Sequence, residues 1–115
     1  MTNKDKTILI KIISYINDIN DYIDGFNYDA FIKDKKTLYA CSFSISQIGE
    51  LTNELSDLIQ NNNSHIPWKS IKGMRNKIVH DYTNVDLMIL WNTITSNLND
   101  LKISLEIILS NHIEP

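Results

Sequence analysis

Apolar residues recur every three or four positions along most of the chain, the spacing that gathers side chains on one face of an α-helix. This pattern predicts helical segments over residues 7–23, 28–32 (a single short turn), 35–59, 67–80 and 85–109. Between them stand Gly25 and the run of turn formers at 61–64, residues that typically end a helix. Pro67 suits a first helical turn, because proline lacks only an N–H group that is unpaired there anyway.

The connections between the predicted helices are short, so we expect consecutive long helices to lie antiparallel. The chain holds only three glycines and two prolines, too few for the many turns of a sandwich or barrel of strands. Its 115 residues can bury one sizeable core but not two. The sequence therefore predicts an all-α protein, a single domain over residues 1–115, built as an up-and-down four-helix bundle with a short third helix.

Composition indicates the class of protein and its place in the cell, but it does not identify a function. Hydrophobic residues make up 43% of the chain and charged residues 22%, which is ordinary for a globular protein. No apolar run near the N-terminus reaches the length of a signal peptide or membrane span, because Lys11, Asn17 and Asp18 interrupt it. The single cysteine, Cys41, is expected on a buried helix face. We predict a cytoplasmic protein.

A local basic stretch stands out in a chain whose net charge is −3. It contains Lys69, Lys72, Arg75 and Lys77, and no carboxylate occurs between Asp57 and Asp81. Bulk electrostatics will not hold nucleic acid to an acidic protein, so any RNA site must be local. The three lysines are candidate RNA-binding residues.

Arg75 and His80 are the candidate catalytic residues of this stretch. A guanidinium offers a permanently charged planar fork for phosphate oxygens, and an imidazole exchanges protons near neutral pH. A histidine can take a proton from a ribose 2′-OH or give one to the leaving 5′-oxygen, while the arginine stabilises charge on the phosphate. Together they suffice to cleave RNA without a metal or another cofactor.

Helix geometry complicates this pairing. Residues five apart on a regular helix point about 140° from a common direction, whereas Asn76 and His80, four apart, share a face. Three arrangements remain open: the helix loosens near Val79, the long Arg75 side chain reaches round, or two subunits contribute to one site across a symmetry axis. We favour the last, because a dimer doubles the basic patch and forms a groove for single-stranded RNA.

On these residues alone, an ordinary surface helix explains the pattern better, but the surrounding motifs change that interpretation. The segment resembles the HepT family of the HEPN superfamily, whose signature R-x4-H-x-Y is matched by Arg75, His80 and Tyr82. Further matches are Ile66-Pro67-Trp68, Gly73-Met74, Asn76, Val85-Asp86 with Trp91, and Ile48-Gly49-Glu50 in the preceding helix. The resemblance spans nearly the whole domain.

The resemblance implies a homodimeric, metal-independent endoribonuclease that acts as the toxin of a toxin–antitoxin pair. It implies Arg75 and His80 as the catalytic pair, with Asn76 in a supporting polar role. The family's usual partner is an MntA-type minimal nucleotidyltransferase, an antitoxin that transfers AMP to the motif tyrosine, here Tyr82. Such AMPylation places a phosphodiester anion beside the catalytic pair and competes with RNA.

Some positions depart from the family pattern. Leu51 replaces a common alanine, Thr83 replaces a frequent aromatic or apolar residue, and Asp81 stands where a small residue is frequent. A carboxylate beside His80 alters its electrostatics and repels RNA, so Asp81 bears on the level of activity. The alternative function is a non-catalytic dimeric HEPN module that only partners a nucleotidyltransferase.

Other distinctive residues have plainer explanations. His65 and His112 are isolated, so no metal site is expected. Trp68 and Trp91 are expected to anchor a core or interface rather than stack on bases. Gly49 suits a close approach of two helices, and Glu50 suits either solvent or a helix pairing.

Overall fold

Helices are the only regular secondary structure in the part of the chain that the structure describes. The computed structural model describes the backbone of residues 1–80 and 87–111, and the side chains of residues 1–74 and 87–111. In these ranges the regular elements are α1 (Asn3–Ile23), α2 (Tyr28–Lys33), α3 (Lys35–Asn53), α4 (Asp57–Asn62), α5 (Trp68–His80), α6 (Leu87–Asn92), the π-helical segment η2 (Thr93–Asn97) and α7 (Leu98–Asn111). The prediction of an all-α fold is confirmed.

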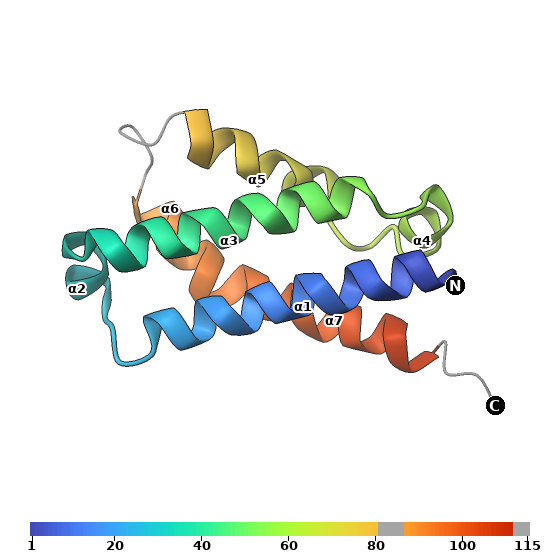
Figure 1. Cartoon of the computed structure of the whole chain (residues 1–115), viewed down its shortest axis with the longest axis horizontal. Coiled ribbons are helices and arrows are strands. Elements are labelled where there is room, and N and C mark those ends of the chain that lie inside the picture. Colours follow the sequence, from blue (N-terminus) through green and yellow to red (C-terminus); the bar gives the residue numbers. More distant parts are fainter. Residues whose placement is uncertain (81–86, 112–115) are drawn as a thin grey trace.

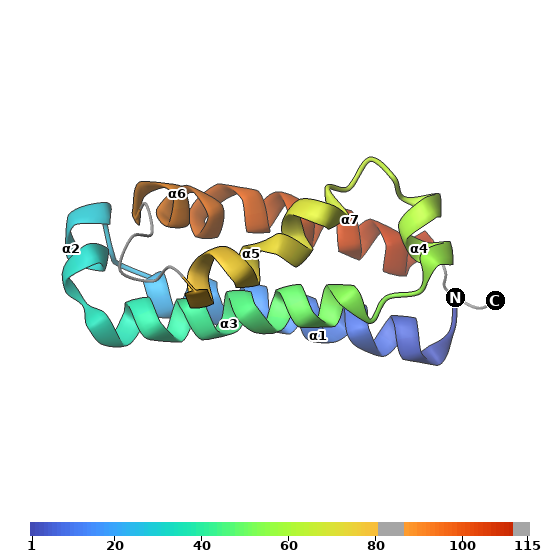
Figure 2. The ribbon, with the colours of Figure 1, turned by 90° about the horizontal axis from the view of Figure 1, so that it is seen from above.

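The long helices alternate in direction along the bundle, as Figure 1 shows. Helices α1 and α3 lie antiparallel side by side, and α5 runs back along α3 in both views (Figures 1 and 2). Segments α6, η2 and α7 follow one another as the fourth arm, which packs on α1. The arrangement is the predicted up-and-down bundle with a shorter third helix.

One cluster of apolar side chains fills the space between these helices. The most deeply buried members, each at most 2% exposed, are Leu9, Ile12, Ile16, Ile19, Phe31, Cys41, Ile45, Ile48, Ile94, Leu98 and Leu105. They recur at the spacing of three and four that the sequence showed, which is why these segments fold as amphipathic helices. None of the described helices combines the length and the apolarity needed to span a membrane.

Polar side chains fix where the helices begin. The side-chain oxygens of Thr2, Asn27, Asp34 and Ser56 each accept a hydrogen bond from the backbone N–H three residues on, at the starts of α1, α2, α3 and α4. Each such cap satisfies an N–H group that has no partner within its own helix. After α1, Gly25 adopts φ +80°, a backbone conformation that glycine tolerates best.

The prediction of one continuous helix over residues 35–59 is wrong. Helix α3 ends at Asn53 and α4 begins at Asp57, with Ser56 as its cap. The cause lies far away in sequence, on α1: an Asp5 oxygen accepts a bond from Ser56 N at 3.0 Å, and the other accepts one from Ser56 Oγ at 2.6 Å. These bonds hold Ser56 in an extended conformation that a continuing helix does not allow.

The predicted helix over residues 85–109 is also interrupted. Its described part begins at Leu87, because residues 85 and 86 lie outside the described residues, and it contains η2 in its middle. Thr93 Oγ1 donates to the carbonyl of Ile89 at 2.9 Å, and Thr95 Oγ1 donates to that of Trp91 at 2.7 Å. Hydroxyls that bond back to a preceding turn compete with backbone bonds and distort helices.

Replacing Asp5 with asparagine should weaken the contact between α1 and α4 in a pH-dependent way. Burial alone raises the pKa of the 3%-exposed Asp5 carboxyl, but bonds from Ser56 and Thr2 and the nearby Lys4 outweigh it and hold the pKa below 3.8. The carboxylate therefore stabilises the fold above that pH and loses its contribution as the pH falls through the lowered pKa.

Urea unfolding should show Asp5→Asn to be about 1.5–3 kcal/mol less stable than wild type at neutral pH, the range for hydrogen bonds to a charged group. The difference should shrink as the pH falls below 3.8. A difference that stays constant across this range would exclude the ionised carboxylate as its source.

Candidate functional site

The start of α5 is anchored by the Ile-Pro-Trp motif. Ile66, Trp68 and Ile71 are all buried, at 4%, 8% and 6% exposure. Trp68 Nε1 donates to two carbonyl oxygens of the α4 turn, those of Gln60 and Asn63, each at 3.1 Å. A buried indole needs such an acceptor, and two acceptors fix its orientation. Trp68 is therefore a core anchor, as predicted, and it sets the position of α5.

Gln60 ties α4 to α5 a second time. Its Oε1 accepts a 2.7 Å hydrogen bond from Lys72 Nζ, and its Nε2 donates to the Leu55 carbonyl at 2.9 Å. Lys72, a predicted RNA-binding residue, is half-buried and holds the first turns of α5 in place. Lys69, also predicted to bind RNA, is exposed and lies one turn earlier on the same helix.

The predicted catalytic residues lie on an unbroken α-helix. Arg75, Asn76, Lys77 and His80 all belong to α5, which remains α-helical to His80. The loosening near Val79 that we considered is therefore not observed. Positions 75 and 80 stand about 140° apart around the axis of a regular helix, and positions 76 and 80 share a side. The side chains of residues 75–80, and all of Asp81, Tyr82 and Thr83, lie outside the described residues.

The C-terminal end of α5, which carries Arg75 and His80, lies over the N-terminal half of α3 in both views (Figures 1 and 2). Helices α3 and α5 are packed together, and Ser42 and Gly49 of α3 are buried. A Cβ added to Gly73 of α5 would meet nothing within 4 Å. The packing of the described residues thus does not require a glycine at 73.

Cys41 and Trp91 occupy the packing positions that the sequence predicted for them. Burial raises the pKa of the Cys41 thiol to about 12, so this cysteine is an unreactive core residue. Trp91 is half-buried and packs against Phe31, with ring centroids 5.0 Å apart, and edge-on against Tyr28 at 6.4 Å. It anchors α6 to α2.

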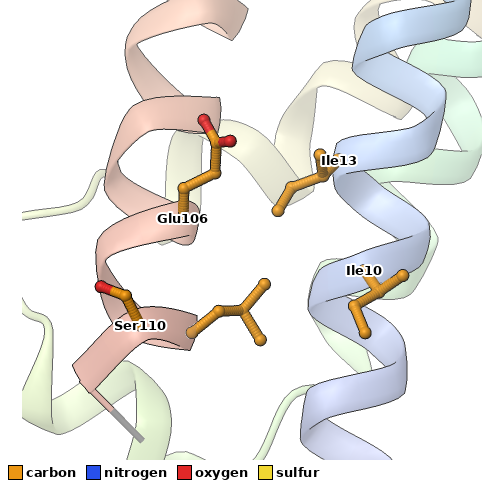
Figure 3. Close-up of a pocket in the computed structure, with 5 residues that line it drawn as sticks. Ile10, Ile13, Glu106 and Ser110 are labelled. Atoms are coloured by element: carbon orange, nitrogen blue, oxygen red, sulfur yellow. The ribbon is translucent and has the colours of Figure 1, made fainter. Parts of the chain in front are cut away.

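A shallow apolar groove of about 490 Å³ lies between α1 and α7, away from α5 (Figure 3). Its lining residues are Ile10, Ile13, Glu106, Leu109 and Ser110. A single carboxyl and a hydroxyl offer little for acid–base chemistry or phosphate binding. Among the described residues no three His, Cys, Asp or Glu side chains gather to bind a metal ion.

Comparison with known proteins identifies the family. The family model described as "Ribonuclease HepT-like" matches residues 12–108, a range that includes α5 and nearly the whole bundle. The chain belongs to the HepT-like ribonuclease family, within the HEPN superfamily. No solved structure gives a significant match.

Several relatives are similar to this chain along most of their length. "Putative RNase MJ0125" of Methanocaldococcus jannaschii is 33% identical over 104 residues, covering 90% of each chain. "Putative RNase MJ0127" of the same organism is 34% identical over 110 residues, covering 94% of this chain and 91% of the relative. "Probable ribonuclease HepT" of Thermococcus cleftensis is 29% identical over 102 residues, covering 89% and 93%.

Sequence reasoning missed two residues that position helices, Gln60 for α5 and Asp5 for α4. The sequence assigned no role to Gln60, yet this residue accepts bonds from both Trp68 and Lys72. The sequence assigned no role to Asp5 either, yet this residue fixes the start of α4. Neither stands out in a hydrophobic pattern, although Asp5 follows Thr2 at the spacing of a helix cap.

Proposed function

We propose that this chain is a metal-independent endoribonuclease and that Arg75 and His80 are its catalytic pair. The observation that carries the proposal is the family match over residues 12–108, which includes both residues, on a helix that runs unbroken between them. The names of the relatives, which describe ribonucleases, point the same way. Neither catalytic role requires a metal ion or another cofactor.

In the proposed reaction a ribose 2′-oxygen attacks the adjacent phosphorus and the 5′-oxygen of the next nucleotide leaves. His80 accepts the proton of the 2′-OH or supplies one to the leaving oxygen. Arg75 stabilises the charge that grows on the phosphoryl oxygens, with Asn76 as a polar support. The products carry a 2′,3′-cyclic phosphate and a 5′-hydroxyl. Lys69, Lys72 and Lys77 bind neighbouring phosphates of the RNA.

We propose further that the active form is a homodimer with Arg75 and His80 of different subunits at each scissile phosphate. Positions 75 and 80 diverge by about 140° on a regular helix, so one α5 does not aim both at one point. A twofold axis beside α5 brings position 75 of one subunit toward position 80 of the other. We also propose that residues 1–115 form a single domain and that the protein acts in the cytoplasm.

Cleavage of RNA in excess EDTA tests the proposed activity. The purified chain should cut RNA without added metal and leave cyclic phosphate ends, which mass spectrometry of the fragments identifies. His80→Ala, purified in parallel, controls for contaminating nucleases. No cleavage, or cleavage only with a divalent metal, would leave the non-catalytic binding module as the better description.

We propose that the protein is the toxin of a toxin–antitoxin pair whose antitoxin is an MntA-type minimal nucleotidyltransferase. That enzyme would attach AMP to Tyr82: the tyrosine oxygen attacks the α-phosphorus of ATP, pyrophosphate leaves and the hydroxyl proton is released. The added anion then competes with RNA near Arg75 and His80. Tyr82 is two positions after His80 in the sequence, with only Asp81 between them, and this proximity supports a modification close to the proposed site.

Incubation with the partner nucleotidyltransferase and ATP should add one or more AMP units to the intact mass and suppress RNA cleavage. Peptide mapping should place the addition at Tyr82, and Tyr82→Phe should keep cleavage but resist inhibition. The exposed Tyr22→Phe serves as the matched control. Unchanged mass, or full modification of Tyr82→Phe, would contradict this assignment.

A further inference from the structure

Two aromatic side chains stand exposed on the N-terminal half of α3. Tyr39 is 55% and Phe43 60% exposed, although Phe31 of the neighbouring α2 is fully buried. The two residues are four apart on one helix and therefore share a face. The C-terminal end of α5 lies over this same half of α3 (Figures 1 and 2). The aromatic pair thus lies outside the core, on the half of α3 over which the end of α5 lies.

Exposed lysines precede this pair on the chain. Lys33, Lys35 and Lys36 are exposed at the junction of α2 and α3, and Lys36 lies one turn before Tyr39 on the same side of the helix. The intervening Asp34 uses its Oδ1 to accept a bond from Thr37 N at 3.3 Å as the cap of α3. The other nearby carboxylates are Asp29 on α2 and Glu50, further along the same side of α3.

We propose that Lys36, Tyr39 and Phe43, the α3 stripe, hold the single-stranded RNA that leads to or from the scissile phosphate. A backbone phosphate pairs with Lys36, and bases stack on the two rings. Exposed aromatic rings beside lysines suit single-stranded nucleic acid, because every base has a face that stacks. Protein interfaces, by contrast, are depleted in lysine. The inference rests on the proposed function, since it assigns a subsite to the same substrate.

Binding measurements on a cleavage-deficient background test the stripe. Fluorescence anisotropy of a labelled oligoadenylate would compare His80→Ala with His80→Ala carrying Phe43→Ala. Loss of one stacked base is worth ~1–3 kcal/mol, so the Kd should rise about 5- to 150-fold. Phe43→Trp should preserve or tighten binding. Tyr22→Ala, which removes another exposed aromatic ring, should leave the Kd unchanged.

Salt dependence separates the two contributions. Lys36→Gln should reduce the slope of log Kd against log salt by about 0.7, the value for one phosphate of a single strand. Phe43→Ala should leave that slope unchanged while it weakens binding at every salt concentration. Equal slopes for parent and Lys36→Gln, or a Kd within about twofold of the parent for Phe43→Ala, would overturn the proposal.

Sedimentation of the same variants decides whether a second copy of the chain, and not RNA, covers the stripe. The proposal expects Phe43→Ala to assemble like its parent, and a loss of assembly would overturn it. The two hypotheses also fail separately. If the wild-type protein cleaves RNA and Phe43→Ala binds it normally, the α3 stripe is rejected as an RNA subsite and the ribonuclease proposal stands. If Phe43→Ala weakens RNA binding but the wild-type protein does not cleave RNA, the ribonuclease proposal is rejected and the α3 stripe stands as an RNA-binding surface.

Discussion

His80→Ala should lower the rate of RNA cleavage by about 10²–10⁴-fold, the range that general acid–base assistance supplies. The imidazole is proposed to move the proton between the attacking or leaving oxygen and solvent, and alanine cannot replace it. The effect should fall on kcat more than on KM, because proton transfer occurs in the transition state and not in the bound complex. Single-turnover cleavage of a labelled RNA in EDTA measures it.

Two comparisons make the His80 result specific. His65→Ala removes an exposed histidine before α5 and should cleave like wild type. Thermal unfolding of His80→Ala should match wild type, so that the loss is chemical and not a loss of fold. If a properly folded His80→Ala cleaves RNA at the wild-type rate, His80 has no part in the mechanism. A non-catalytic binding module would then describe the protein better.

Arg75→Ala should slow cleavage by about 10²–10³-fold, the typical loss of a donor that stabilises transition-state charge. Arg75 is the only arginine of the chain, and its planar fork binds phosphate oxygens in pairs. Arg75→Lys keeps the charge but not the fork, so we expect cleavage at least ~10-fold below wild type. The same single-turnover assay in EDTA compares the three proteins.

Lys11→Ala, a charge removal at an exposed position of α1, is the matched control for Arg75→Ala and should cleave normally. A rate for Arg75→Lys equal to wild type would show that charge alone suffices. A wild-type rate for Arg75→Ala would contradict the proposed catalytic pair.

Much of the bundle follows from local pattern. Residues such as Ile12, Ile16 and Ile19 repeat at helical spacing and all proved buried. The pattern predicted the start of α5 well, because Pro67 and Trp68 signal a helix start in the sequence itself. The spacing of apolar residues is enough to predict a helix wherever one face of that helix packs on the common core.

The misplaced boundaries depend on contacts that local pattern does not contain. The break before α4 comes from Asp5, which bonds to Ser56 across 51 positions of sequence. The π-helical segment coincides with Thr93 and Thr95, whose hydroxyls bond to the preceding turn. Apolar spacing alone does not distinguish a continuous helix from one interrupted by such polar side chains.

The candidate site was predictable as a sequence motif but not as a geometry. The motif places Arg75 and His80 on one helix, and α5 contains both. In the proposed dimer, whether they meet depends on how two copies assemble, and no local sequence pattern specifies that assembly. The bonds from Trp68 and Lys72 to Gln60, which support the helix, were not predicted either, because a single glutamine forms no recognisable sequence pattern.

Mixing Arg75→Ala with His80→Ala tests most directly whether two subunits share each site. If Arg75 and His80 of different subunits meet at one phosphate, every heterodimer has one complete site and one that lacks both residues. With random exchange half of the dimers are mixed, so cleavage should return to about a quarter of the wild-type rate. A mixture as inactive as the separate variants, with heterodimers confirmed by native mass spectrometry, would contradict a shared site.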